Sequence, residues 1–74
     1  MSENIQSTQR RKAVNAHQDG QHSEALALYN AHLNMYPDDA GMWTNFGVLL
    51  RSLGRHKAAL RVQTRAFELL PSDR

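Results

Sequence analysis

The second half of the chain carries apolar and small residues at helical spacing, bounded by residues that start and stop helices. One face of an amphipathic helix is indicated by residues at the i, i+3, i+4 and i+7 positions, namely Trp43, Phe46, Gly47 and Leu50. Asp38 and Asp39 precede this run, and their carboxylates suit the positive N-terminal end of a helix. Gly54 follows it and can take the left-handed conformation that ends a helix.

A second helix is predicted directly after Gly54 and is ended by Pro71. Its inner side is predicted to carry five apolar residues: Ala59, Leu60, Ala66, Phe67 and Leu70. Because only a few residues separate this helix from the one before it, the two must form an antiparallel hairpin.

The first half follows the same plan, with Gly20 and Pro37 as the two stops. Its second helix has a clear apolar face made of Ala25, Leu26, Tyr29, Leu33 and Tyr36. The first helix, expected from about Ser7 to Asp19, is polar and has only three residues to bury: Ala13, Val14 and Ala16. A polar surface of this kind is typical of a terminal helix that covers the end of a stack of repeats. The alternative explanation is a helix that is partly frayed. We expect residues 1–6 to be disordered and residues 7–74 to form one small domain.

The two halves are related by an offset of 34 residues, which gives seven identities. The identities pair Val14 with Val48, Gly20 with Gly54, His22 with His56, Ala25 with Ala59, Leu26 with Leu60, Pro37 with Pro71, and Asp39 with Asp73. Most of these residues shape the backbone or pack closely, so the repeat is interpreted as architectural. A repeat of this period is typical of helical repeat proteins, which bind other molecules.

Small residues recur at the positions where paired helices should cross. Gly47 and Ala59 fall near the middle of the second pair, and Ala13 and Ala25 hold the corresponding places in the first. A large side chain at a close crossing would hold the helix axes apart. We therefore expect close helix packing at these four positions.

The second copy, residues 40–73, resembles a tetratricopeptide repeat at nearly every defining position. The matching residues are Trp43, Phe46, Gly47, Leu50, Gly54, Ala59, Ala66 and Pro71, and Gln63 departs from the pattern where an aromatic residue is usual. The first copy, residues 6–39, matches at Ala13, Gly20, Ala25, Tyr29 and Pro37 and departs at Gln9, Lys12 and His32. The resemblance implies an all-α fold of two antiparallel helical hairpins stacked as a short right-handed solenoid.

The resemblance also implies a concave groove, lined by the first helix of each pair, that binds a peptide or protein. Carried over by position, the groove residues are Arg10, Val14 and His17 in the first repeat and Thr44, Asn45, Val48, Arg51 and Ser52 in the second. Some members of the family clamp the C-terminal carboxylate of chaperones through three repeats. Arg10 and Asn45 match two clamp positions, but Val14 stands where the clamp has Asn and a third repeat is missing.

Composition and charge limit the remaining classes of function. The chain has no cysteine, no secretory signal and no apolar run long enough to cross a bilayer, so we expect a cytoplasmic protein that does not bind membranes. The net charge is −2 over residues 1–39 and +4 over residues 40–74. This bias can steer an acidic partner toward the second half, but an ordinary solvated surface is the preferred explanation.

No pattern of catalytic residues is present, and we expect neither an enzyme nor a cofactor. The four histidines do not share the i, i+4 spacing of a helical metal site, so no metal is expected. Lys57, Arg61 and Arg65 form a basic stripe, but no aromatic residues are interleaved with it for stacking on bases. A solvated helix face is therefore preferred to a nucleic-acid site.

Two alternatives to a simple interaction module stay open. The chain could be the N-terminal module of a larger bacterial enzyme, such as a glycosyltransferase or methyltransferase, an idea that no residue supports directly. It could also form a homo-oligomer or an array through its last helix, where Leu60, Phe67 and Leu70 would be partly uncovered. Burial of each such side chain is worth about 1.5–3 kcal/mol, which favours association.

Overall fold

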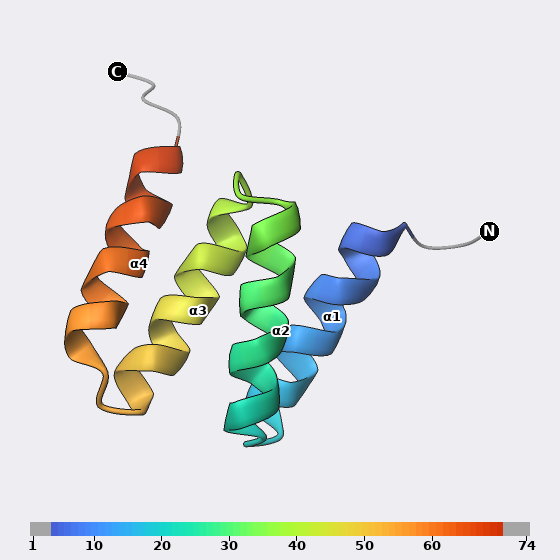
Figure 1. Cartoon of the computed structure of the whole chain (residues 1–74), viewed down its shortest axis with the longest axis horizontal. Helices are drawn as coiled ribbons and strands as arrows, with labels where there is room; N and C mark the ends of the chain where they lie inside the picture. The colour runs from blue at the N-terminus through green and yellow to red at the C-terminus, as the bar shows by residue number, and fades with distance from the viewer. Residues whose placement is uncertain (1–3, 71–74) are drawn as a thin grey trace. The chain divides into compact units, whose positions relative to one another are not determined.

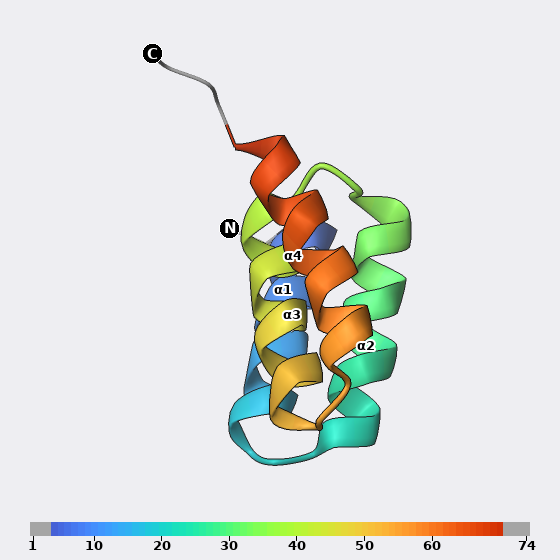
Figure 2. The ribbon, with the colours of Figure 1, turned by 90° about the vertical axis from the view of Figure 1, so that its left-hand side faces the viewer.

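The computed structural model describes residues 4–70, and within that range it contains four helices and no strand (Figure 1). The helices are α1 (Ile5–Gln18), α2 (His22–Met35), α3 (Ala40–Ser52) and α4 (His56–Leu69). Helix α1 packs against α2, and α3 packs against α4, as two views of the ribbon show (Figures 1 and 2). The expected all-α fold of two antiparallel hairpins is confirmed.

The chain divides into two compact units, Met1–Pro37 and Asp38–Arg74. This division lies within two residues of the repeat boundary expected after Asp39. Helices α2 and α4 begin and end exactly one 34-residue period apart, at His22 and His56 and at Met35 and Leu69. The repeat seen in the sequence is therefore a repeat of helix boundaries, and each unit is one hairpin.

Both hairpins turn through the same arrangement of hydrogen bonds. Gly20 and Gly54 have φ angles of 76° and 79°, in the left-handed region that favours glycine. In the first turn the Gly20 N–H donates to the His17 carbonyl over 3.1 Å and the next N–H donates to the Ala16 carbonyl over 2.9 Å. The second turn repeats both bonds at 3.0 Å and 2.9 Å. This is the Schellman arrangement, which satisfies carbonyl groups at the end of a helix.

The first helix of each hairpin begins at a side-chain cap. The Asn4 Oδ1 atom accepts a hydrogen bond of 2.7 Å from the Ser7 N–H, so α1 begins at Ile5. Ile5 and Gln6 belong to α1, although they fall in the segment expected to be disordered, and residues 1–3 of that segment lie outside the described range. The cap predicted before α3 is confirmed, because the Asp39 Oδ1 atom accepts from the Met42 N–H over 3.3 Å.

The core of the first hairpin is built from small residues on α1 and larger ones on α2. Its buried residues are Ala13, Ala16, Ala25, Tyr29, His32 and Leu33. Ala13 and Ala25 have no exposed surface, which agrees with the close crossing expected there. Val14 and Tyr36 are only half-buried. The Gln9 side-chain amide contacts the Met35 sulfur at 3.6 Å, so the start of α1 lies beside the end of α2.

The second hairpin has its closest approach at Gly47. A Cβ atom added to Gly47 would lie 2.6 Å from the Gln63 Cγ atom on α4. Any larger residue at position 47 would force the Gln63 side chain to move, and Gln63 stands where the resembled family usually has an aromatic residue. The structure confirms that Gly47 and Ala59 lie at a close crossing.

The inner face predicted for α4 is only partly correct. Ala59 and Ala66 are buried, but Leu60, Phe67 and Leu70 are exposed by 66%, 76% and 56%. With about 3.6 residues per turn, Leu60 and Phe67 lie roughly a quarter of a turn away from the line joining Ala59 and Ala66. The prediction put Leu60 and Phe67 on the inner side because they are apolar, although their spacing differs from that of Ala59 and Ala66.

Candidate functional site

The five residues predicted to line a groove on the second repeat share one side of α3. They are Thr44, Asn45, Val48, Arg51 and Ser52, and four of them are exposed while Asn45 is half-buried. The residues that α3 buries occupy the opposite side: Met42, Phe46, Gly47, Leu49 and Leu50. We call the first set the α3 strip. It is a continuous surface of hydroxyl, amide, guanidinium and apolar groups on a well-anchored helix.

Some polar groups of the α3 strip already donate hydrogen bonds within the helix. The Thr44 hydroxyl donates to the Ala40 carbonyl over 3.1 Å, and the Ser52 hydroxyl donates to the Leu49 carbonyl over 2.7 Å. Both hydroxyl oxygens can still accept a bond from a ligand. The Asn45 amide makes only a weak contact of 3.8 Å with the Met42 sulfur. Asn45 and Arg51 are therefore the groups of the strip best able to donate to a partner.

The predicted groove residues of the first repeat do not behave as one set. Arg10 is exposed and Val14 is half-buried on the flank of α1, whereas His17 contacts the other helix of its own hairpin. The His17 Nδ1 atom lies 2.8 Å from the Tyr29 hydroxyl oxygen, and the two rings meet edge to face at 5.8 Å. Within this hairpin His17 therefore holds α1 to α2, and its Nδ1 atom is occupied by Tyr29.

The Tyr29 side chain is fully buried, and its hydroxyl bond to His17 keeps its polar end satisfied. Burial raises the pKa of the Tyr29 phenol above its ordinary value of 10.0, because the low-dielectric surroundings disfavour the phenolate. Tyr29 and His17 thus form a structural pair. The sequence indicated Tyr29 as a core residue but did not indicate its partner.

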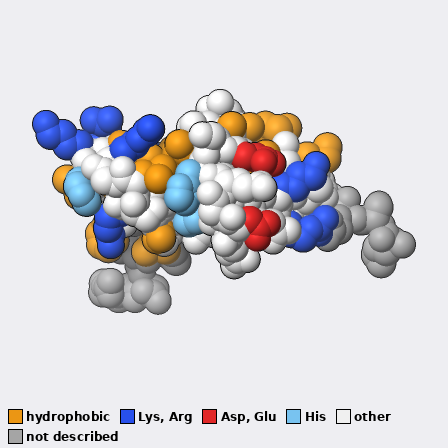
Figure 3. All heavy atoms as spheres, turned by 90° about the horizontal axis from the view of Figure 1, so that it is seen from below, with side chains coloured by type: hydrophobic (Ala, Val, Ile, Leu, Met, Phe, Trp, Pro, Cys, Tyr) orange, Lys and Arg blue, Asp and Glu red, His pale blue; other side chains and the backbone are white. Residues whose placement is uncertain are grey.

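The three residues predicted as a self-association surface, Leu60, Phe67 and Leu70, are exposed on or next to α4. Leu60 and Phe67 lie on the same side of the helix, and Leu70 follows its last residue. Figure 3 shows orange apolar and blue basic side chains together over the part of the molecule formed by α3 and α4, with no red acidic side chain on that part of the face shown. Along α4 itself the exposed residues are mainly apolar and basic, with Glu68 as the acidic residue among them.

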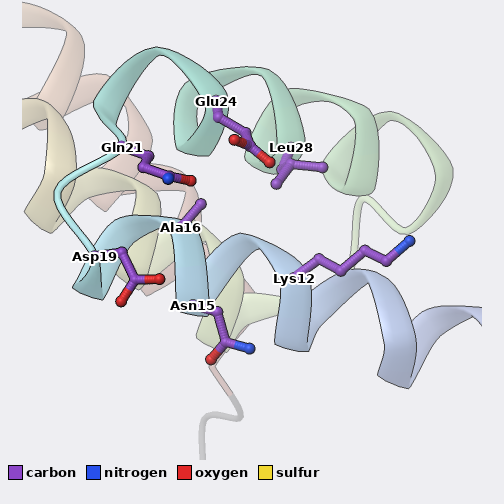
Figure 4. A pocket seen from close by; sticks show the side chains of 7 residues that line it. All are labelled: Lys12, Asn15, Ala16, Asp19, Gln21, Glu24 and Leu28. Carbon is purple, nitrogen blue, oxygen red and sulfur yellow. The ribbon is translucent and has the colours of Figure 1, made fainter.

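An open depression of about 440 Å³ lies over the turn between α1 and α2. It is lined by Lys12, Asn15, Ala16, Asp19, Gln21, Glu24 and Leu28 (Figure 4). The side chain of Lys12 extends away from the carboxylates of Asp19 and Glu24. All the polar side chains of the lining are exposed, so water competes with a ligand at each of them. The depression is therefore a weak candidate for binding a small molecule.

The histidines do not assemble a metal site in the described structure. Within residues 4–70, no three His, Cys, Asp or Glu side chains are close enough to hold an ion together. His22 and His56 are the first residues of α2 and α4 and are exposed, which fits a place next to the turn but not a packing role. His32 is fully buried against Tyr36, with ring centroids 5.1 Å apart.

None of the four described helices combines the length and the apolar character that crossing a bilayer requires.

Comparison with known proteins identifies no relative of the chain. No family model, no curated protein and no solved structure matches it. The function of the α3 strip and of the exposed side of α4 must therefore be inferred from their own geometry and charge.

Proposed function

We propose that the chain is a non-catalytic protein-interaction module that binds a peptide or protein through the exposed sides of α1 and α3. In this proposal the two hairpins are tetratricopeptide-like and stack in a right-handed manner, so that the first helix of each pair lines a concave groove. The observation that carries the proposal is the α3 strip, where exposed polar groups lie opposite a fully packed side of the same helix. A rigid helix can present such groups to a partner at little cost in entropy.

The chemistry of the α3 strip suits an extended peptide segment. The Asn45 amide can donate to and accept from a peptide backbone, and the Arg51 guanidinium can pair with a carboxylate. Val48, which is 48% exposed, lies between them and offers an apolar contact. Arg10 on α1 adds a second positive charge to the proposed surface. We therefore expect a partner segment with at least one carboxylate, either acidic side chains or a chain terminus.

The test is capture of a partner from a cell lysate, with matched variants of the bait. Asn45→Ala combined with Arg51→Ala should reduce recovery of the partner by about tenfold or more, because two bonds that include a charged one are lost. Lys57→Ala combined with Arg61→Ala changes two polar residues on α4 and should leave recovery of this partner unchanged. The proposal is wrong if the α4 variant abolishes capture and the α3 variant does not.

A further inference from the structure

The exposed side of α4 has the features of a second docking surface. Leu60 and Phe67, exposed by 66% and 76%, are separated by about two helical turns on the same side, with Thr64 between them. Leu70, the residue that follows the helix, is also exposed, by 56%. Large apolar side chains that stand in a row on a helix are typical anchors for another helix.

A basic border runs along one edge of this apolar row. Lys57 and Arg61 are exposed on the side of α4 next to Leu60 and Phe67. Within residues 4–70 neither of these two cations forms an ion pair, whereas Arg65 contacts the carboxylate of Glu68 at 3.5 Å. Among the described residues, Lys57 and Arg61 are therefore two positive charges near the apolar row that no carboxylate contacts.

The charge argues against a second copy of this chain as the occupant. Two α4 helices facing one another would bring Lys57 and Arg61 of both copies to the same interface, where like charges repel. Helix α1 is equally unsuitable, because it contains Arg10, Arg11 and Lys12 and no acidic residue. The one carboxylate on those two helices is that of Glu68, which already contacts Arg65, so a partner with carboxylates of its own complements Lys57 and Arg61 better than a second copy does.

A membrane surface is also a poor fit to this side of α4. Glu68 lies on the same exposed side and contacts Arg65, which leaves Lys57 and Arg61 to face anionic headgroups, whereas lipid-binding segments typically carry a cluster of about four to eight basic residues. Only Leu60, Phe67 and Leu70 could enter the lipid, and the row contains no tryptophan or tyrosine to anchor it. A protein partner can place its own side chains around Glu68, which a lipid surface cannot do.

We propose that the exposed side of α4 binds an acidic amphipathic helix of another protein. The apolar side chains of that helix would pack on Leu60 and Phe67, and its carboxylates would pair with Lys57 and Arg61. This surface lies on α4, so the inference does not depend on the function proposed for α1 and α3. The module would then hold two partners on separate helices.

The test uses a synthetic fluorescein-labelled helical peptide with leucines on one side and glutamates at their flanks. Its matched control has lysine in place of each glutamate. Binding is followed by fluorescence anisotropy, and we expect the acidic peptide to bind and the basic one to bind at least tenfold more weakly. Raising the salt concentration should weaken binding of the acidic peptide, because Lys57 and Arg61 are solvent-exposed.

Substitutions in the chain assign the binding to α4. Phe67→Gln should weaken binding of the acidic peptide by about tenfold, since a large apolar contact is lost. Lys57→Gln with Arg61→Gln should remove most of the salt dependence. Ile5→Gln changes an apolar residue that is 61% exposed at the start of α1, outside both surfaces, and should have no effect. Because all four side chains are exposed, the helical circular dichroism of each variant should equal that of the parent chain.

Several results would overturn the inference. The acidic peptide could bind no better than its control, or its binding could be lost with Ile5→Gln and kept with Phe67→Gln. Light scattering could show a concentration-dependent dimer that Phe67→Gln abolishes, which would make a second copy the occupant. Vesicles of phosphatidylcholine with phosphatidylserine could bind the chain through Phe67 while the peptide does not. The two proposals fail in different measurements. The groove proposal fails if Asn45→Ala with Arg51→Ala leaves capture of its partner unchanged, whereas this inference fails if Phe67→Gln leaves binding of the acidic peptide unchanged.

Discussion

The two hairpins share their backbone plan but not their core. Each turns at a glycine with positive φ, and each repeats the same two hydrogen bonds at the same 34-residue spacing. The first hairpin is held by a buried tyrosine that bonds to His17, whereas the second is held by an approach so close that Gly47 has no room for a Cβ atom. Repeats of this kind preserve the conformation of the turn and allow each copy its own packing.

The largest expected effect is a break in the core of the second hairpin. Leu49 has no exposed surface, and Leu49→Ala should lower the free energy of unfolding by about 2–5 kcal/mol, because it removes buried methyl groups and leaves a cavity. The matched control is Leu60→Ala, which truncates the same side chain at a position that is 66% exposed and should cost less than about 0.5 kcal/mol. Urea denaturation followed by circular dichroism measures both. Equal losses would contradict the burial described for α3 and α4.

Because both hairpins have the same turn, replacing the glycine of either turn should cost the same amount of stability. Gly20→Ala and Gly54→Ala should each destabilise the protein by about 1–2 kcal/mol, since an L-residue is strained at these φ angles. Apart from the two adjacent residues of the chain, no heavy atom lies within 4 Å of an added Cβ at either site, so backbone strain and not a clash causes the loss. A chemically synthesised chain with D-alanine at either position should be as stable as the parent. A loss several times larger at one turn than at the other would show that the turns are not equivalent.

The close approach in the second hairpin predicts coupling between Gly47 and Gln63. Gly47→Ala gains about 1 kcal/mol of helix propensity but pushes the new Cβ atom into the Gln63 side chain. After Gln63→Ala has removed that side chain, the same Gly47→Ala change should stabilise the protein. A double-mutant cycle of unfolding free energies should therefore give a coupling of about 0.5–3 kcal/mol. Strict additivity would mean that the two residues do not meet.

The polar pair of the first hairpin predicts a smaller effect that depends on pH. Tyr29→Phe removes the bond to His17 and should cost about 1 kcal/mol near neutral pH. Since the folded state raises the pKa of Tyr29 above 10.0, the neutral phenol contributes fully below that pH, and stability is lost as the pH rises through the folded pKa. The gap in stability between the parent and Tyr29→Phe should therefore narrow above about pH 10. A gap that stays constant to higher pH would contradict the burial of the phenol.

The sequence predicts the backbone of this protein better than its surfaces. The stops at Gly20 and Gly54 and the cap at Asp39 are local, so they could be predicted from residue type alone. Burial depends on which side of a helix meets its partner. That is why Leu60 and Phe67, which were expected on the inner side and only partly uncovered, are in fact mostly exposed, whereas their neighbours Ala59 and Ala66 are buried as expected.

The interactions that depend on tertiary contacts could not be predicted from one chain. Met42 and Leu49 are fully buried, but they lie outside the spacing that indicated the inner side of α3. The bond between His17 and Tyr29 joins two helices, and no local pattern indicates it. The predicted groove residues show the same limit of prediction from sequence. Those of the α3 strip share one side of their helix, but His17 contacts Tyr29 in its own hairpin, which the sequence did not indicate.

The most direct test of the proposed function is a map of where a captured partner touches the chain. The amide resonances of the isotopically labelled protein are followed by NMR as the purified partner is added. The largest shifts should fall on the α3 strip, from Thr44 to Ser52, with further shifts around Arg10 and Val14 on α1. Shifts confined to α4, with the α3 strip unchanged, would contradict the central claim that the first helix of each hairpin carries the interaction.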